Sequence, residues 1–262
     1  MRVALMIEGQ EGVTWPQWLA LAHAAEEAQL DALFRSDHYR AIGRGDPNGA
    51  LDAWGTICAL AAVTATIRLG TLVSPVTFRK PSVLAKLATT ADHISGGRIE
   101  LGIGAGWFEA EHDAYGFDFG TQRSRLDELD RQLAEITRQW TEADDVWPKP
   151  LQQPRPPIIV GGRAKPRTVA AAVRHADEYN TVWPTVDEAR ERKRRLDDAA
   201  AHAGREPLRF SIMIRLEGSA EELEERLRAY EEVGVDRVML QHLEHEDVET
   251  VAMVGEVAAR LR

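Results

Sequence analysis

An aspartate and a histidine stand side by side in the segment Ser-Asp-His-Tyr at residues 36–39. Imidazole changes its charge near neutral pH, and a neighbouring carboxylate can orient the ring and set that charge. Asp37 and His38 are therefore candidates for donating or accepting a proton. The same pair is also an ordinary beginning of a helix or turn, and residue type alone leaves both interpretations open.

Three alternate glycines, Gly102, Gly104 and Gly106, lie in the segment RIELGIGAGWFEAEHDAYG at residues 98–116. Their spacing differs from the dinucleotide-binding fingerprint, in which the third glycine comes three residues after the second. Glycines in a strand remove side chains from its surface, so a flat ring can approach the backbone. We therefore expect a thin wall against a planar cofactor rather than a phosphate loop.

The residues that follow these glycines could line a pocket. They are Trp107, Phe108, Glu109, Glu111 and His112. We count Glu111 among the catalytic candidates because a carboxyl group can carry a proton. The run EAEHD at 109–113 is equally typical of a solvated turn.

A second glycine-containing segment, GGRAKPR at 161–167, carries three cations in a chain of net charge −10. Pro166 suits the first turn of a helix, and a helix N-terminus offers unpaired N–H groups and a positive dipole end to an anion. We predict that this segment binds a phosphate. A plain strand-to-helix turn is the alternative.

One cluster, HLEHE at 242–246, resembles a set of metal ligands. Comparable groups after the other expected strands are limited to Asp37 and His38, so we predict no metal site and expect a helix-entry loop. The charged segment 186–204 has no interleaved aromatic residues and is interpreted as a solvated helix face rather than a nucleic-acid surface.

Composition narrows the function classes. The 262 residues include 32 Lys+Arg and 42 Asp+Glu, so nucleic acid or an anionic bilayer would be a poor partner. The single cysteine, Cys58, excludes an internal disulfide and favours a reducing compartment. No apolar run approaches the roughly 18 residues that cross a bilayer. We expect a cytoplasmic protein with neither a nucleic-acid nor a membrane partner.

Short apolar segments alternate with longer amphipathic ones along the chain, which predicts eight strands and eight helices. Strands are predicted at 2–8, 31–37, 67–73, 98–104, 158–162, 178–183, 208–216 and 235–243. Helices are predicted at 15–30, 51–65 (after a loop rich in Gly and Pro), 82–95, 123–140, 166–176, 186–204, 220–234 and in a last segment that ends at 262.

This alternation predicts an α/β fold in one domain over residues 1–262. Continuous apolar strands indicate a parallel sheet covered by helices, and eight βα units in about 250 residues fit a (β/α)₈ TIM barrel. A doubly wound sheet is the second choice. In a barrel, the chemistry lies just after the C-terminal ends of the strands, where several of the candidates above stand.

Four segments in order resemble the bacterial luciferase-like monooxygenase superfamily, and within it the F420-dependent oxidoreductases most closely. They are SDH at 36–38, LGTLVSPVTFRKP at 69–81, GGRIELGIGAGWFEAEHDAYG at 96–116 and PPIIVGG at 156–162. The resemblance covers about residues 1–183, and the last third matches only in its βα rhythm.

The resemblance implies a barrel that binds F420 or FMN at its C-terminal mouth, commonly as a homodimer. It also implies a non-prolyl cis peptide at the end of the third strand, by position Leu72–Val73, and places His38 near the hydride-bearing carbon. The implied cofactor contacts are Ser36, Leu72, Val73, Gly104, Ala105, Gly106, Val160, Gly161, Gly162 and Arg163.

Two features depart from the family pattern. Some sugar-phosphate dehydrogenases of the F420 branch carry a glutamate directly after G-x-G-x-G, where this chain has Trp107, so Glu109 and Glu111 are the nearby substitutes. The segment between Trp140 and Pro156 is shorter than in many relatives. We expect a shortened insertion before the fifth strand, and from it a more open substrate pocket.

The leading functional hypothesis is therefore an F420-dependent oxidoreductase that transfers a hydride between the deazaflavin and a small organic substrate, with His38 handling a proton. An FMN-dependent luciferase-like monooxygenase is the alternative within the same class. A non-catalytic flavin- or F420-binding barrel and a metal-dependent barrel hydrolase are the alternatives from other classes.

Overall fold

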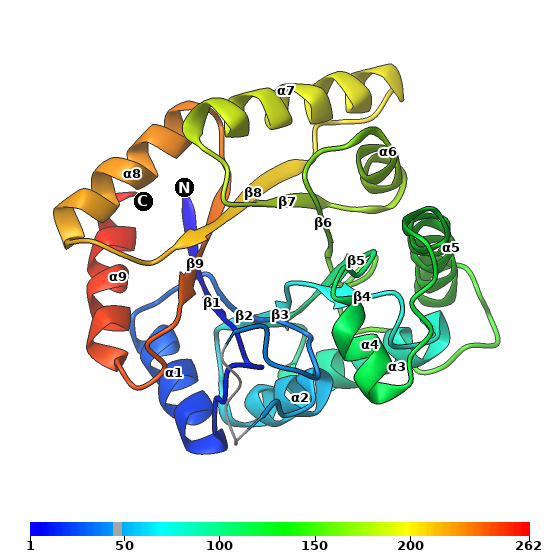
Figure 1. Ribbon diagram of the computed structural model, residues 1–262, viewed down its shortest axis with the longest axis horizontal. Coiled ribbons are helices and arrows are strands. Elements are labelled where there is room, and N and C mark those ends of the chain that lie inside the picture. The colour runs from blue at the N-terminus through cyan, green and yellow to red at the C-terminus, as the bar shows by residue number, and fades with distance from the viewer. Residues whose placement is uncertain (44–48) are drawn as a thin grey trace.

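Parallel strands close into a barrel that is surrounded by helices (Figure 1). The structure is a computed structural model that describes residues 1–43 and 49–262. Residues 44–48, in the Gly- and Pro-rich loop expected after the second strand, lie outside the described residues. The α/β barrel that the sequence predicts is confirmed, and the doubly wound alternative is wrong.

The strands of the described chain follow one another around the barrel in the order β3-β2-β1-β9-β8-β7-β6-β5-β4, and an additional pairing of β3 with β5 closes the ring. β3 and β4 both pair with β5, so together they fill one of the eight positions. The strands are β1 Arg2–Ile7, β2 Ala32–Arg35, β3 Arg68–Thr71, β4 Ser74–Pro75, β5 Ile99–Gly104, β6 Ile158–Gly161, β7 Glu178–Val182, β8 Arg209–Arg215 and β9 Arg237–His242.

The helices lie outside the strands, and several begin at residues that the sequence marks as caps. Thr121, Thr185 and Ser219 each form a reciprocal capping box with the third helical residue, and proline opens α3 and α6. The helices are α1 Trp15–Glu27, α2 Ala53–Val63, α3 Pro81–Ser95, α4 Glu109–Tyr115, α5 Gln122–Thr141, α6 Pro166–His175, α7 Val186–His202, α8 Ala220–Glu232 and α9 Val248–Arg260.

Two elements go beyond the eight-plus-eight prediction. β4 has two residues, too few for an apolar pattern to mark. α4 forms where the sequence also allowed a solvated turn, and it buries Glu111 and His112. The turn interpretation of 109–113 is therefore wrong.

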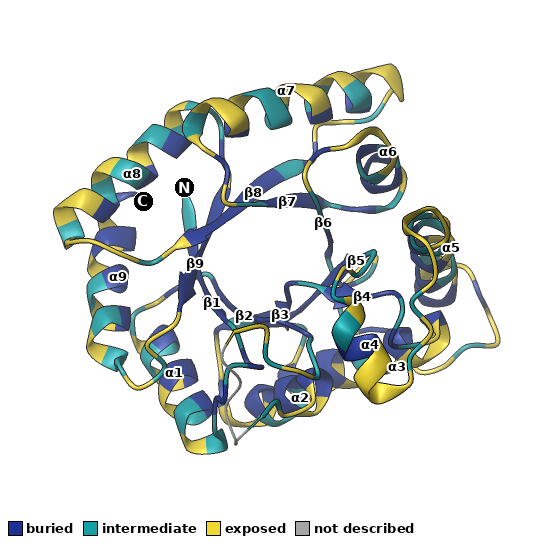
Figure 2. Cartoon of the chain, in the orientation of Figure 1, coloured by how far each residue is buried: buried dark blue, intermediate teal, exposed yellow. Residues whose placement is uncertain are grey.

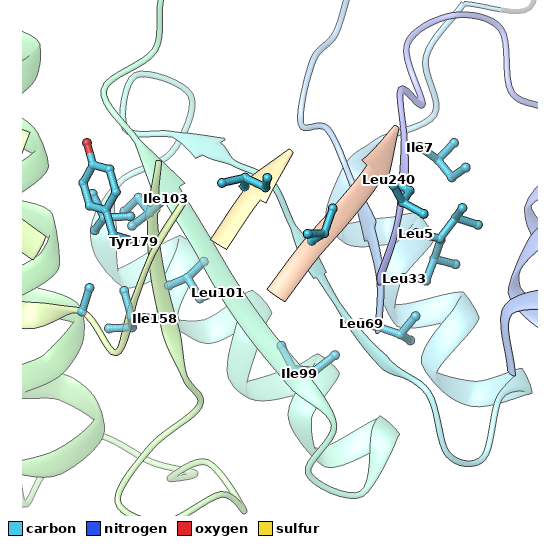
Figure 3. Close-up of a cluster of buried hydrophobic side chains, with 14 of the residues drawn as sticks. Leu5, Ile7, Leu33, Leu69, Ile99, Leu101, Ile103, Ile158, Tyr179 and Leu240 are labelled. Carbon is cyan, nitrogen blue, oxygen red and sulfur yellow. The ribbon is translucent and has the colours of Figure 1, made fainter. Parts of the chain in front are cut away.

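Alternate residues of each strand face two different cores. Outward side chains such as Leu5, Leu33 and Leu69 pack against the helices, where the large core of the protein lies (Figure 3). Inward side chains form a smaller cluster of Ala4, Met6, Ala32, Phe34, Leu72, Ile159, Met213 and Met239. The helices accordingly turn buried residues to the barrel and exposed ones to solvent (Figure 2).

A buried ion cluster closes the inside of the barrel at the beginnings of the strands. Arg237 is fully buried, and its Nη2 donates to Glu100 Oε2 at 2.6 Å and to Glu178 Oε2 at 2.5 Å. Its Nη1 donates to Asp31 Oδ2 at 2.9 Å. Arg68 also pairs with Glu100 and Arg209 with Glu178, so these two arginines and Arg237 balance the three carboxylates. This end of the barrel is therefore held by ion pairs rather than by apolar packing.

The segment between α5 and β6 lies at this same end. Leu151 N and Gln152 N donate to Asp92 Oδ2 near the end of α3, and Gln152 Nε2 donates to the carbonyl of Ile99 at the beginning of β5. Its length therefore does not control the mouth. The expectation that a shorter segment here opens the substrate pocket is wrong.

Within the described residues, no helix is both long enough and apolar enough to cross a membrane.

Candidate active site

The carboxyl ends of the barrel strands bring three distant segments to one mouth. Ser36, Asp37 and His38 follow β2, the segment from Ala105 onward follows β5, and Gly162 and Arg163 follow β6. In a parallel barrel these ends face the same side, which is where the sequence predicts the chemistry.

His38 pairs with Glu111 across the mouth. Nδ1 of His38 lies 2.8 Å from Oε1 of Glu111, and the backbone N–H of Tyr39 donates to Oε2 at 3.1 Å. Glu111 is almost fully buried, whereas His38 is partly exposed. Because an ionised carboxylate only accepts, Nδ1 of His38 carries the proton and Nε2 is left for another partner.

Asp37 has a different role from the one expected. Its Oδ2 accepts from Ser74 Oγ at 2.6 Å and from Arg79 Nη1 at 2.6 Å, and its side chain is buried. The carboxylate that orients His38 is Glu111, so the sequence-based pairing of Asp37 with the His38 ring is wrong. Asp37 instead ties the end of β2 to β4 and the loop after it.

Arg79, which was not predicted as a site residue, links this arrangement to the N-terminus of α2. Its Nη2 donates to Asp52 Oδ2 at 2.9 Å and to the Tyr39 hydroxyl at 3.3 Å. Burial lowers the pKa of Arg79, but the carboxylates of Asp37 and Asp52 and the Tyr39 hydroxyl outweigh it, and the net pKa is raised. Arg79 therefore stays charged beside Asp37 and Tyr39.

His112, the neighbour of Glu111, fixes α4 in place. Its Nδ1 lies 2.8 Å from the carbonyl of Phe108, and its Nε2 lies 2.7 Å from Thr77 Oγ1. A carbonyl only accepts, so in the neutral ring Nδ1 is the donor and Nε2 accepts from the Thr77 hydroxyl. The ring also packs on Phe78 and Phe119, with centroids 5.1 and 4.6 Å apart.

The strand glycines make room for protein rather than for a ligand. A Cβ on Gly102 would lie 1.9 Å from the carbonyl oxygen of Thr71, and one on Gly104 would lie 2.6 Å from Cγ2 of Val73. A Cβ on Gly161 would lie 3.1 Å from Cγ1 of Val73. The prediction that Gly102 and Gly104 form a thin wall against a cofactor is therefore wrong. The space that their side chains would occupy is filled by the segment from β3 to β4.

The peptide bond between Leu72 and Val73 is cis, as the family resemblance implies. Leu72 belongs to the inward cluster and Val73 packs against it, so this bond lies on the floor of the mouth. Ala105 and Gly106 follow at the rim, where Gly106 has a φ of +78°. Val160 is fully buried and faces the outer core rather than the mouth.

The turn after β6 is organised by Tyr179. Its hydroxyl accepts from Ala164 N at 2.9 Å, and Gly162 N donates to the carbonyl of Asn180 at 2.9 Å. A Cβ on Gly162 would lie 2.5 Å from the Tyr179 hydroxyl, so only glycine fits there. These two N–H groups are therefore used inside the protein.

Other donors of this turn remain available to an anion. Lys165 is the N-cap residue of α6, and its side chain accepts no hydrogen bond from the first turn of the helix. The first-turn N–H groups therefore have no capping side chain at this position. Arg163 and Lys165 are exposed, and in the described part of the chain neither forms an ion pair. Arg167 pairs with Asp127, so two of the three expected cations are available rather than three.

Glu8, Gln10 and Gln241 form a group of polar side chains on the opposite side of the mouth, which was not predicted from the sequence. Gln241 Nε2 donates to Glu8 Oε1 at 2.6 Å, and Gln10 Nε2 donates to Glu8 Oε2 at 2.9 Å. Ser36 Oγ donates to Gln10 and accepts from Gly9 N, so this predicted cofactor contact is tied to the loop after β1. Glu8 and Gln241 lie inside the strands predicted at 2–8 and 235–243, so the rule that chemistry follows strand ends does not find them.

The histidines of HLEHE do not come together with other ligands. His242 Nε2 lies 2.9 Å from the carbonyl of Asp247, just before α9. Over residues 1–43 and 49–262, no three His, Cys, Asp or Glu side chains are grouped so that they could hold a metal ion.

Comparison with known proteins identifies the family. The sequence model described as luciferase-like monooxygenase matches residues 2–217. The chain belongs to the luciferase-like monooxygenase family. The resemblance drawn from the sequence is confirmed, and with it the expectation that the protein is an oxidoreductase of this luciferase-like type.

One relative resembles this chain in sequence over most of its length. An uncharacterized protein, Rv0953c of Mycobacterium tuberculosis, is 30% identical over 224 residues, covering 80% of this chain and 76% of its own.

The luciferase-like fold also recurs in solved structures. An F420-dependent secondary alcohol dehydrogenase in complex with an F420-acetone adduct superposes with a TM-score of 0.85 at 16% identity, over 100% of this chain and 99% of its own. The oxygenating constituent of 3,6-diketocamphane monooxygenase from Pseudomonas putida, in complex with FMN, gives a TM-score of 0.79 at 16% identity, over 99% of this chain and 98% of its own.

Proposed function

We propose that this chain is an F420-dependent oxidoreductase that transfers a hydride between the deazaflavin and a small organic substrate. The pair of His38 and Glu111 at the barrel mouth carries the proposal, because it provides a fixed proton donor and acceptor beside a cofactor site. The fold likeness to an F420-dependent alcohol dehydrogenase supports it.

The residues of the mouth fit such a cofactor. We propose that its planar ring lies on Leu72 and Val73 beside Ala105 and Gly106, and that its phosphate reaches the first turn of α6. Two exposed cations, Arg163 and Lys165, stand at that turn in a chain of net charge −10. A helix N-terminus with cations beside it is a suitable phosphate site.

The proton would move at Nε2 of His38. Bound F420 would supply the hydride chemistry. When an alcohol carbon gives up a hydride, Nε2 takes the hydroxyl proton and the C–O bond becomes a carbonyl; in the reverse direction Nε2 returns the proton. Glu111 holds the ring orientation through Nδ1 and balances the charge of the imidazolium.

A titration of the purified protein with F420 and with FMN tests the cofactor. We expect F420 to bind at micromolar concentration and FMN more weakly. Arg163→Ala should raise the Kd of F420 roughly tenfold, because a charged hydrogen bond is lost. Arg167→Ala is the matched control, since Arg167 is already paired with Asp127. Tight binding of FMN with no binding of F420 would contradict the proposal and favour the FMN-dependent monooxygenase.

We also propose that two copies associate through α2 and α3. Val63, Val83 and Ile94 are exposed apolar residues of these helices, and a groove of about 390 Å³ lies along α3 between Val83 and Leu87. Exposed apolar side chains that gather in one patch are typical of an interface. Val83→Glu should halve the mass measured by light scattering, and an unchanged or monomeric wild-type mass would argue against this interface.

The single-domain organisation over residues 1–262 and the cytoplasmic location remain proposals. The pairing of β1 with β9, in register from Arg2 with Arg237 to Ile7 with His242, joins distant parts of the chain and supports one domain. One calorimetric transition is expected, and two would contradict it. The free thiol of Cys58 agrees with a reducing compartment, which fractionation of the source cells would test.

A further inference from the structure

We propose that the substrate is an uncharged apolar compound with an aromatic or alicyclic ring, bound against Trp107 and Phe108 at the barrel mouth. This inference rests on the proposed function. It names the class of substrate that would meet His38.

Exposed apolar side chains concentrate at the mouth. Eleven large hydrophobic side chains are exposed among the described residues. Six of them lie in segments that follow strands, which all open on the same end of a parallel barrel. These six, which we call the apolar rim, are Ile42, Leu51, Trp107, Tyr115, Trp183 and Leu243. Exposed apolar side chains that gather at one end of a protein indicate a binding site rather than ordinary surface.

Two aromatic rings of the chain stand directly at His38. Trp107 and Phe108 stack on each other, with centroids 5.3 Å apart and planes at 26°. Each presents itself edge-on to the His38 ring, at 6.0 Å and 79° for Trp107 and 6.2 Å and 73° for Phe108. Trp107 is 62% exposed, so most of its face is open to a ligand. A substrate ring could stack there with its reacting carbon toward His38.

The charges around His38 disfavour an anionic substrate. Arg79 is engaged by Asp37 and Asp52, and Arg40 donates to the carbonyl of Ala110. The buried carboxylate of Glu111 would repel a second negative charge. Among the exposed cations described at the mouth, Arg163 and Lys165 lie at the proposed phosphate site, Arg215 lies over the ring of Trp183 at 5.9 Å, and Arg40 is held at the carbonyl of Ala110. The reacting end of the substrate is therefore neutral.

Three ketones that differ in one property each test the substrate class. Acetone, acetophenone and 4-acetylbenzoate are titrated into the cofactor-free protein and followed by ligand-observed NMR, which reads binding without turnover. Acetophenone should bind about tenfold more tightly than acetone, because the added ring buries apolar surface. 4-Acetylbenzoate should bind about tenfold more weakly than acetophenone, because its carboxylate must lose water against the apolar rings of Trp107 and Phe108. Equal binding of acetone and acetophenone, or preference for the anion, would overturn the proposal.

A pair of tryptophan variants locates the binding. Trp107→Ala should raise the Kd of acetophenone about tenfold and leave that of acetone unchanged. Trp147→Ala is the matched control, because Trp147 is 67% exposed in the segment between α5 and β6, at the other end of the barrel. A Kd for acetophenone that is the same in both variants would refute the site.

The ketone titrations test the substrate class, and the F420 titration tests the cofactor, so either proposal can fail without the other. If acetophenone binds as expected and the F420 titration fails, the substrate class stands and the cofactor assignment falls. If Trp107→Ala changes the oligomeric mass in light scattering but not ketone binding, the apolar rim is a contact between copies and the inference is wrong.

Discussion

Nδ1 of His38 lies 2.8 Å from Oε1 of Glu111, although the two residues are 73 positions apart in the chain. The pair forms because β2 and β5 end at the same side of the barrel and α4 turns Glu111 inward. His38→Ala should lower turnover with F420 by about 10²- to 10⁴-fold, because a positioned proton donor is lost. The Kd of F420, measured by titration, should stay the same; unchanged turnover would instead favour a non-catalytic binding barrel.

Glu111→Gln tests the orienting role. The amide keeps the size of the side chain but removes its charge, so it no longer balances an imidazolium at His38. We expect turnover to fall by about 10- to 100-fold, as for other groups that orient a functional histidine. Glu109→Gln is the matched control, because Glu109 is exposed on the same helix. Equal effects of the two variants would show that the pairing with His38 has no part in the reaction.

The hydrogen bond between Thr77 and His112 should be measurable in stability. Thr77→Val removes the hydroxyl and leaves Nε2 of the buried His112 without its donor. We expect a loss of about 1–3 kcal/mol in the free energy of unfolding by urea. His112→Phe removes both ring nitrogens and therefore both of their hydrogen bonds. The double variant should then cost little more than His112→Phe alone. Strictly additive effects would mean that the two side chains do not interact.

The buried ion cluster should make stability depend on acid pH. Burial opposes ionisation of Glu100, but the charge and hydrogen bonds of Arg237, with those of Arg68, outweigh it and lower its pKa from 4.5 to about 2. Because the pKa of Glu100 is lower in the folded than in the unfolded protein, its ionised form adds to the free energy of unfolding. This contribution is fully present above the unfolded pKa and is lost as the pH falls from about 4.5 toward 2. Urea unfolding between pH 7 and pH 3 should show this loss.

Arg237→Met provides the corresponding variant. It leaves Glu100 and Glu178 buried without their cation and should cost about 3–5 kcal/mol at pH 7. Because the pKa of Glu100 would then rise, the further loss of stability at acid pH should shrink. Arg138→Met, which breaks only a surface pair with Glu135, should cost less than about 1 kcal/mol. Similar costs for the two variants would contradict the importance of the buried cluster.

Gly104 should tolerate no side chain while Val73 is present. Gly104→Ala places a Cβ against Cγ2 of Val73 and should lower the unfolding free energy by about 1–3 kcal/mol. The double variant with Val73→Ala should recover part of that loss. Gly55→Ala serves as the control, because its Cβ would meet only ordinary contacts in α2. A harmless Gly104→Ala would show that the strand has room for a ligand after all.

The regular elements could be predicted from the sequence, because apolar periodicity and cap residues are local properties. α4 could not: its N-cap residue, Phe108, makes no side-chain cap, and the helix is held by contacts to His38 and Thr77 that are distant in sequence. The partner of Asp37 was missed for the same reason, since Arg79 lies 42 positions away.

The glycines show the second limit of sequence reasoning. G-x-G-x-G indicates that something approaches the backbone closely, but the pattern is the same whether a ligand or the protein itself does so. Here Thr71 and Val73 fill the space. The position of the cis peptide was inferred only through family resemblance.

The residues around the beginning of α4 have two different roles. Trp107 and Phe108 would contact the substrate, and Glu111 orients His38. Trp107 and Phe108 precede the helix, and Phe108 bonds to His112 through its backbone carbonyl rather than through its side chain. Randomising these two positions in a variant library should therefore change which compounds the protein accepts while the proton-handling pair stays where it is. The barrel mouth thus offers a short, replaceable stretch of chain for redesign of selectivity.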